Sequence, residues 1–154
     1  AALNKRGVVD RAVVLPMSVK VGEADTRVCS LLSESLDQHG ISADEVSVEG
    51  AYECLRNMND VDGLIGMRYH SIVAAYCVGT PFVAVSYHPK CRTFCSEIGY
   101  DNQLVIDVES LQVSALESAC LMMFSDRSCY GPDQMTRREA RERFQRSFFP
   151  GALC

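Results

Sequence analysis

From residue 10 onward, short apolar runs alternate along the chain with longer segments of helical periodicity. Strands are predicted where the short apolar runs occur, at 12–15, 46–48, 63–66, 81–86 and 104–106. Helices are predicted where apolar residues recur every three or four positions, at 23–39, 51–58, 71–78, 90–98 and 111–124. Gly40 is expected to cap the first of these helices, and the third should end at Gly79.

Two of the predicted helices have apolar residues grouped on one face. These residues are Val28, Leu31, Leu32 and Leu36 in 23–39, and Tyr52, Leu55 and Met58 in 51–58. Strands separated by helices of this length need crossover connections, which place neighbouring strands parallel. The pattern therefore predicts an α/β fold, a Rossmann-like parallel sheet with helices on both faces.

The alternation stops after residue 126, and this defines the expected domain organisation. Residues 1–130 should form the α/β domain, and 131–154 a helical extension with a capping box at Thr136 and Glu139. The extension's charged helix is either solvated and held by local charge pairs, or packs on this domain or on a partner domain. In the second case its contacts would be Phe144, Phe148 and Phe149.

Composition narrows the class of protein. The chain has 154 residues, of which 47% are hydrophobic and 23% charged, as in one globular domain. A formal charge of −5 argues against sequence-independent binding of nucleic acid, which requires a basic surface. The longest apolar run, 72–78, is too short to span a membrane, and residues 1–7 lack the apolar segment of a secretory signal. A soluble, cytoplasmic protein is expected.

Eight cysteines are many for this length. They include no Cys-x-x-Cys pair, and the chain has three histidines, so a zinc site is weakly supported and no metal is expected. Most of the cysteines lie within apolar periodic segments. We therefore interpret them as small buried thiols in a reducing compartment.

Chemically active side chains follow the third and fourth predicted strands. The third strand leads to Arg68 and His70, and the fourth to Tyr87, His88 and Lys90. Ligands of open parallel sheets bind beyond the carboxyl ends of the strands, where helix amino termini also point. Arginine binds carboxylate or phosphate through two hydrogen bonds, lysine adds positive charge, and histidine transfers protons near neutral pH. Any one of them could have an ordinary structural role, but together they predict a site for a small anion.

Three short motifs in residues 62–99 carry a family resemblance. They are an Arg-x-His element opening a helix, a Gly-x-Pro before a strand, and a Tyr-x-x-Lys after it. In this chain they are Arg68 and His70, Gly79 and Pro81, and Tyr87 and Lys90. In this order and spacing they resemble the carboxy-terminal part of the polysaccharide pyruvyl transferases.

The resemblance implies a fold like the second, donor-binding domain of GT-B transferases. It also implies transfer of pyruvate from phosphoenolpyruvate to a sugar of a cell-surface or exopolysaccharide precursor, as a ketal, with release of phosphate. Arg68 would bind the anionic groups of phosphoenolpyruvate and His70 would be the candidate acid, while Tyr87, His88 and Lys90 would line the donor site. The implied partners are phosphoenolpyruvate as co-substrate, a glycan or lipid-linked sugar acceptor, and an amino-terminal acceptor domain outside this chain.

The sequence departs from the family pattern at two positions and leaves other functions open. Tyr69 stands where the family usually has an aliphatic residue, and His88 where an acidic residue is common. One alternative is the nucleotide-sugar-binding domain of a GT-B glycosyltransferase or epimerase, in which Glu49 would take a ribose hydroxyl. Another is a non-catalytic α/β binding module.

Overall fold

The computed structural model describes residues 2–17, 25–47, 50–125 and 142. The chain divides into two compact units, 1–49 and 50–154, and each is described here by itself. The expected extension, 131–154, lies outside the described residues except for Glu142, so the domain boundary at 130 stays a prediction.

The first unit contains two parallel strands and the helix that connects them. Its elements are α1 (Ala2–Lys5), β1 (Arg11–Val14), α2 (Asp25–Gln38) and β2 (Ser42–Glu45). The strands pair in register from Arg11 opposite Ser42 to Val14 opposite Glu45, and the Arg11 guanidinium bonds Asp44 across the pair at 2.8 Å. Two parallel strands joined through a helix form the basic unit of a parallel sheet.

The second strand lies earlier in the chain than the sequence predicted. Strand propensity favoured 46–48, but the strand is Ser42–Glu45. Gly40, in the left-handed conformation at φ 75° as expected of a helix cap, turns the chain immediately after α2. The Ile41 N–H then bonds the Leu36 carbonyl, and pairing with β1 begins one residue later. The turn at Gly40 therefore sets where β2 begins, although the β-branched residues that favour a strand come later, at 46–48.

The apolar face of α2 is largely exposed. Val28, Leu31 and Leu32 are 58%, 57% and 49% exposed, and Leu36 is half-buried. The buried side of the helix is rotated from this face and includes Ser33. The apolar residues do share one face of α2, as the sequence predicted, but α2 buries a different face.

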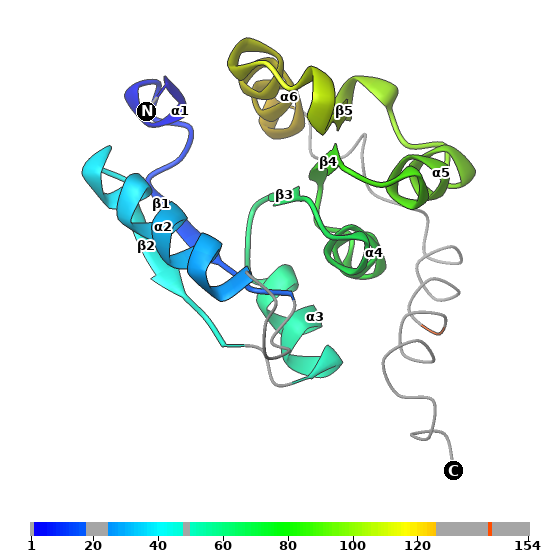
Figure 1. Cartoon of the computed structure of the whole chain (residues 1–154), viewed down its shortest axis with the longest axis horizontal. Helices are drawn as coiled ribbons and strands as arrows, with labels where there is room; N and C mark the ends of the chain where they lie inside the picture. Colours follow the sequence, from blue (N-terminus) through cyan, green and yellow to red (C-terminus); the bar gives the residue numbers. More distant parts are fainter. Residues whose placement is uncertain (1, 18–24, 48–49, 126–141, 143–154) are drawn as a thin grey trace. The chain divides into compact units, whose positions relative to one another are not determined.

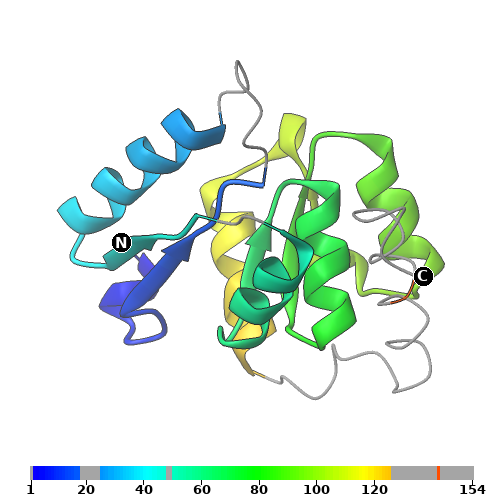
Figure 2. The ribbon, with the colours of Figure 1, turned by 90° about the horizontal axis from the view of Figure 1, so that it is seen from below.

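The second unit is a three-stranded parallel sheet covered by helices. Its elements are α3 (Ala51–Asn59), β3 (Leu64–Gly66), α4 (Tyr69–Val78), β4 (Phe82–Ser86), α5 (Pro89–Glu97), β5 (Val105–Asp107) and α6 (Val113–Ser125), with short 3₁₀ turns η1 (Asn102–Leu104) and η2 (Val108–Ser110) flanking β5. The strand order is β3-β4-β5. Figure 1 shows α4 and α5 on one face of this sheet and α6 on the other, and Figure 2 shows α3 beside α4.

These elements confirm an α/β protein with parallel strands packed against helices. The described strands form two sheets, one of two strands and one of three, rather than the single five-stranded sheet that the alternation suggested. All three strand pairings are parallel, as the crossover argument required.

The core of the second unit surrounds β4. Every residue of this strand is buried, and Phe82, Val83 and Ala84 are at most 1% exposed. A strand in the middle of a parallel sheet is covered on both faces, so it is apolar throughout rather than alternating. From α3, Met58 enters this core, whereas Tyr52, which shares its helical spacing, is 77% exposed.

Tyr100 completes the hydrogen bonding of β4 at its first residue. The Tyr100 hydroxyl accepts from the Phe82 N–H at 2.8 Å and donates to the Phe82 carbonyl at 2.7 Å, and the two rings stack 4.0 Å apart. Pairing with β5 begins only at Ala84, two residues further on. The hydroxyl therefore occupies the position of a strand neighbour.

We predict that Tyr100→Phe lowers the free energy of unfolding by about 1–3 kcal/mol, because it leaves two buried backbone groups of Phe82 without partners. Urea unfolding followed by circular dichroism measures this change. The matched control is Tyr52→Phe, which removes the same hydroxyl from an exposed ring and should change stability by less than about 0.5 kcal/mol. Equal stability of the two variants would show that the Tyr100 hydroxyl does not support β4.

Candidate anion-binding site

The first turn of α4 begins directly at the end of β3. Arg68 is the residue before the helix, and its carbonyl accepts from the Ser71 hydroxyl at 2.6 Å and the Ser71 N–H at 3.0 Å. Gly66 ends the strand, and a Cβ there would lie 3.0 Å from Ser71 Oγ and 3.1 Å from Ile72 Cγ1. The absence of a side chain at Gly66 thus lets α4 start close against β3, which places Arg68 and His70 at the strand end.

The first turn of α5 is arranged similarly at the end of β4. Pro89 occupies the first helical position, where its missing N–H costs nothing. His88 precedes it, and its Nδ1 accepts from the Lys90 N–H at 3.2 Å. The contact of His88 with a donor stays a prediction, and the structure shows that its ring nitrogen caps α5. The family's common acidic residue at this position could cap in the same way.

The predicted cations from the two strand ends act on each other. His70 packs edge-to-face with Tyr69 at 5.5 Å. Neighbouring protein atoms exclude part of the water around its imidazole, which lowers the pKa of His70, and the positive charge of Lys90 lowers this pKa further. A bound anion would oppose both effects by favouring the protonated ring. The sequence predicted that side chains from the ends of β3 and β4 would lie in one region, but the effect of Lys90 on the pKa of His70 could be identified only in the folded chain.

Tyr69 joins the start of α4 to α5. Its ring meets Phe94 edge-to-face at 5.8 Å, and Phe94 meets Tyr76 in the same way at 5.6 Å. Such pairs are favourable beyond the area they bury. The aromatic residue that departs from the family pattern therefore packs between the two helices, as a structural element of the site.

Tyr87 and Lys90 remain at the surface of this strand end. Tyr87 is 49% exposed and meets the His88 ring edge-to-face at 6.3 Å, and Lys90 is also exposed. The exposed ring and the exposed ammonium, both just after the end of β4, are accessible to a ligand from solvent.

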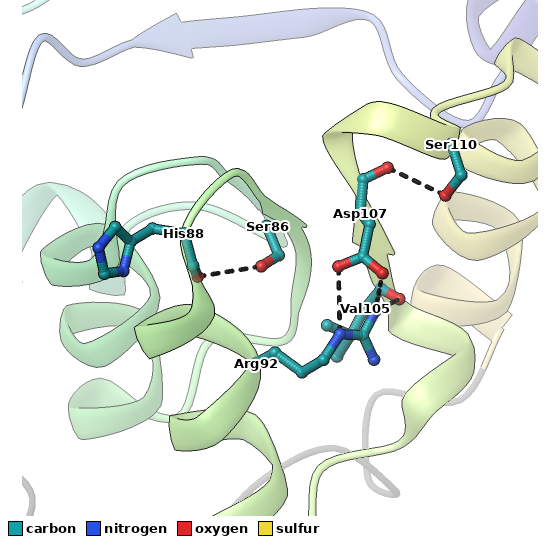
Figure 3. A network of polar contacts seen from close by, with 6 residues as sticks. All are labelled: Ser86, His88, Arg92, Val105, Asp107 and Ser110. Atoms are coloured by element: carbon teal, nitrogen blue, oxygen red, sulfur yellow. Dashed lines mark hydrogen bonds and ion pairs between the residues drawn. The ribbon is translucent and has the colours of Figure 1, made fainter.

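Sequence reasoning missed an ion pair at the end of β5. Arg92, in α5, binds Asp107 through two bonds, Nη2 to Oδ2 at 2.8 Å and Nε to Oδ1 at 3.1 Å (Figure 3). The signal was available, because the rule that selected residues after the third and fourth strands also applies to Asp107, the last residue of the fifth. Its partner on α5 could not be identified from the sequence.

Among the cysteines that the structure describes, all but Cys29 are buried, which fits the interpretation of most of them as buried thiols. Burial raises the pKa of Cys54, Cys95 and Cys120 to about 11, so these thiols are protonated and unreactive near neutral pH. Within the described ranges, the structure groups no set of three or more His, Cys, Asp or Glu side chains suited to a metal ion. Among the same residues, no helix has the length and apolar character needed to cross a bilayer. Glu49, considered for a ribose contact, lies outside them.

Fold and site together define an α/β protein in which helices begin at parallel strand ends that gather cationic and imidazole side chains. A family model described as polysaccharide pyruvyl transferase matches residues 11–89. The chain belongs to the polysaccharide pyruvyl transferase family. A search of the curated proteins found no match, and a search of the solved structures found none.

The family model covers a different part of the chain, residues 11–89, from the motifs, which lie within 62–99. It begins at β1 and so includes strands of the first unit, where the motifs gave no signal. It contains Arg68, His70 and Tyr87 and ends at Pro89, one residue before Lys90. Family membership therefore covers most of the candidate site, while Lys90 is connected to it by its effect on His70.

We predict that His88→Ala destabilises the chain by about 1 kcal/mol, because the first turn of α5 loses its side-chain cap. His88→Asp should retain the stability of the native chain, since aspartate also accepts a bond from the Lys90 N–H and favours the positive end of the helix dipole. Thermal and urea unfolding of the two variants provide the comparison. If His88→Ala is as stable as the native chain, the cap contributes nothing.

We predict that Lys90→Met raises the pKa of His70, because it removes a positive charge that opposes protonation. Titration of the three histidines by NMR measures this, with His70→Gln identifying the signal. The exposed Lys5 gives the control Lys5→Met, which should leave the pKa of His70 unchanged because Lys5 is not one of the causes of its shift. No change in Lys90→Met would contradict the coupling.

Proposed function

We propose that this chain provides the donor-binding part of a pyruvyl transferase that moves pyruvate from phosphoenolpyruvate to a sugar of a cell-surface or exopolysaccharide precursor. The observation that carries the proposal is that His70, at the start of α4, and Lys90, at the start of α5, follow the adjacent paired strands β3 and β4, within and directly after the segment that matches the family. Arg68 stands two residues before His70 at the same strand end.

The charges of this group suit phosphoenolpyruvate. The donor carries a carboxylate and a phosphate, so it needs more than one cationic contact. Arg68 can bind one of these groups through two parallel hydrogen bonds, and the mobile ammonium of Lys90 can neutralise the other. The amino terminus of α4, a helix of ten residues, adds a favourable dipole for a bound anion.

The proton balance of ketal formation gives His70 its proposed role. Addition of a sugar hydroxyl to C2 of the enol requires a proton at C3, and the second hydroxyl then displaces phosphate from C2. In the free chain the pKa of His70 is lowered, so the ring favours its neutral form. Arrival of an anionic donor would reverse the field at the ring and favour its protonation. Donor binding would therefore prepare the acid that the first step consumes.

The acceptor would be a glycan or a lipid-linked sugar held by a further domain, as the family resemblance implies. The parallel strands and crossover helices support the expected likeness to the second domain of GT-B transferases. Tyr87 and His88, exposed after the end of β4, are proposed as walls of the donor site, and His88 also caps α5.

We predict that phosphoenolpyruvate binds the chain and that Arg68→Ala weakens this binding by about 10-fold or more, the loss typical of hydrogen bonds to a charged group. Calorimetric titration measures the affinities. His70→Gln should also weaken binding, since a neutral side chain cannot gain positive charge beside the donor. The matched control is Arg56→Ala on α3, an exposed arginine that should leave binding unchanged.

Thermal melts with other ligands separate the alternatives. A rise in the unfolding temperature with UDP or GDP, but not with phosphoenolpyruvate, would favour a nucleotide-sugar enzyme, since a ligand stabilises the fold it binds. No response to any of the three would favour a non-catalytic binding module. Equal binding by the native chain and Arg68→Ala would remove Arg68 from the site.

A further inference from the structure

Groups at the ends of β3 and β4 both hold the first turn of α5. The Met67 carbonyl, directly after β3, accepts from the Cys91 thiol at 3.9 Å. The Ser86 hydroxyl, at the end of β4, donates to the His88 carbonyl at 3.2 Å (Figure 3). Each contact is weak or long, but they approach the turn from two different strands.

The end of β5 provides the third and strongest contact. The two bonds between Arg92 and Asp107 form a planar fork, which restrains rotation as well as distance. Asp107 is itself held, because its carbonyl accepts from the Ser110 hydroxyl at 3.2 Å in the turn that follows (Figure 3). The two bonds therefore join Arg92, two residues after Lys90 in α5, to the end of β5, which Ser110 holds in place.

The ion pair is poorly placed to contribute to stability. The Arg92 and Asp107 side chains are 43% and 50% exposed, and pairs in such surroundings are worth about 0–1 kcal/mol. The first unit contains a comparable pair, Arg11 with Asp44, whose side chains are 70% and 47% exposed. That pair joins two adjacent strands, whereas Arg92 joins a strand end to the helix turn that carries Lys90.

We propose that Arg92 and Asp107 are positioning residues for the donor site, whose ion pair holds the first turn of α5 so that Lys90 stays beside His70. The inference deepens the proposed function and rests on it for the identity of the donor. The placement of Lys90 against His70, however, can be measured with no donor present. Neither residue of the pair needs to touch the substrate.

The pKa of His70 is the readout, because Lys90, a described residue at the start of α5, lowers it. Arg68 and Tyr69 adjoin His70 in the same helix turn. Arg92→Gln removes a positive charge and Asp107→Asn a negative one. Direct electrostatics would therefore shift this pKa upward in the first variant and downward in the second. Loss of positioning would shift it upward in both, toward the ordinary value of 6.5.

We expect NMR titration to show an upward shift of the His70 midpoint in both Arg92→Gln and Asp107→Asn. Arg92→Lys, which keeps the charge without the fork, should give a smaller upward shift, and the exchanged pair Arg92→Asp with Asp107→Arg should recover part of the native value. The matched control Arg11→Gln breaks the ion pair with Asp44 and should leave the midpoint unchanged. Shifts of opposite sign, or none, in the two single variants would overturn the proposal.

Donor binding separates this proposal from the proposed function. Arg92→Gln and Asp107→Asn should each weaken phosphoenolpyruvate binding about 3- to 10-fold, less than loss of Arg68, because the ligand contacts are displaced rather than removed. If the native chain binds no phosphoenolpyruvate while both variants still raise the pKa of His70, the donor assignment fails and the positioning role stands. If the native chain binds the donor and neither variant changes the His70 midpoint, the positioning role fails alone.

Discussion

The second unit depends on satisfying the backbone of a strand that has no access to water. β4 is buried along its whole length, so each of its N–H and carbonyl groups needs a protein partner. β3 and β5 supply most of them, but β5 starts two residues late, and the Tyr100 hydroxyl bonds both polar groups of Phe82 in its place. Once β4 is held in this way, its carboxyl end has a fixed position relative to the ends of its neighbours.

That fixed position concentrates positive charge at one edge of the sheet. Lys90 and His70 follow different strand ends; burial lowers the pKa of His70, and the positive charge of Lys90 lowers this pKa further. Like charges repel each other, and solvent or a bound anion reduces this repulsion. Both side chains are exposed, so water screens the repulsion between them. An anionic ligand bound between them would attract both.

The residues around this edge divide into those that face a ligand and those that hold the turns. Gly66 allows α4 to approach β3, and His88 caps α5. Tyr69 packs against Phe94 between the two helices. These contacts leave Lys90 exposed while its backbone is fixed by the cap. A site for a small anion needs this combination of rigid backbone and accessible charge, because a displaced cation loses most of its interaction.

The sequence by itself determined the class of fold, most of the element positions and the cations that follow β3 and β4, because apolar periodicity and strand-end placement are local properties. The sequence placed the second strand wrongly, because strand propensity takes no account of where the chain turns at Gly40. Only the tertiary structure decided that His88 caps a helix and that Arg92 pairs with Asp107. Those facts depend on distances between side chains and backbone groups, which chain order does not specify. The pKa of His70 depends on them too, because burial and a neighbouring charge exist only in the folded chain.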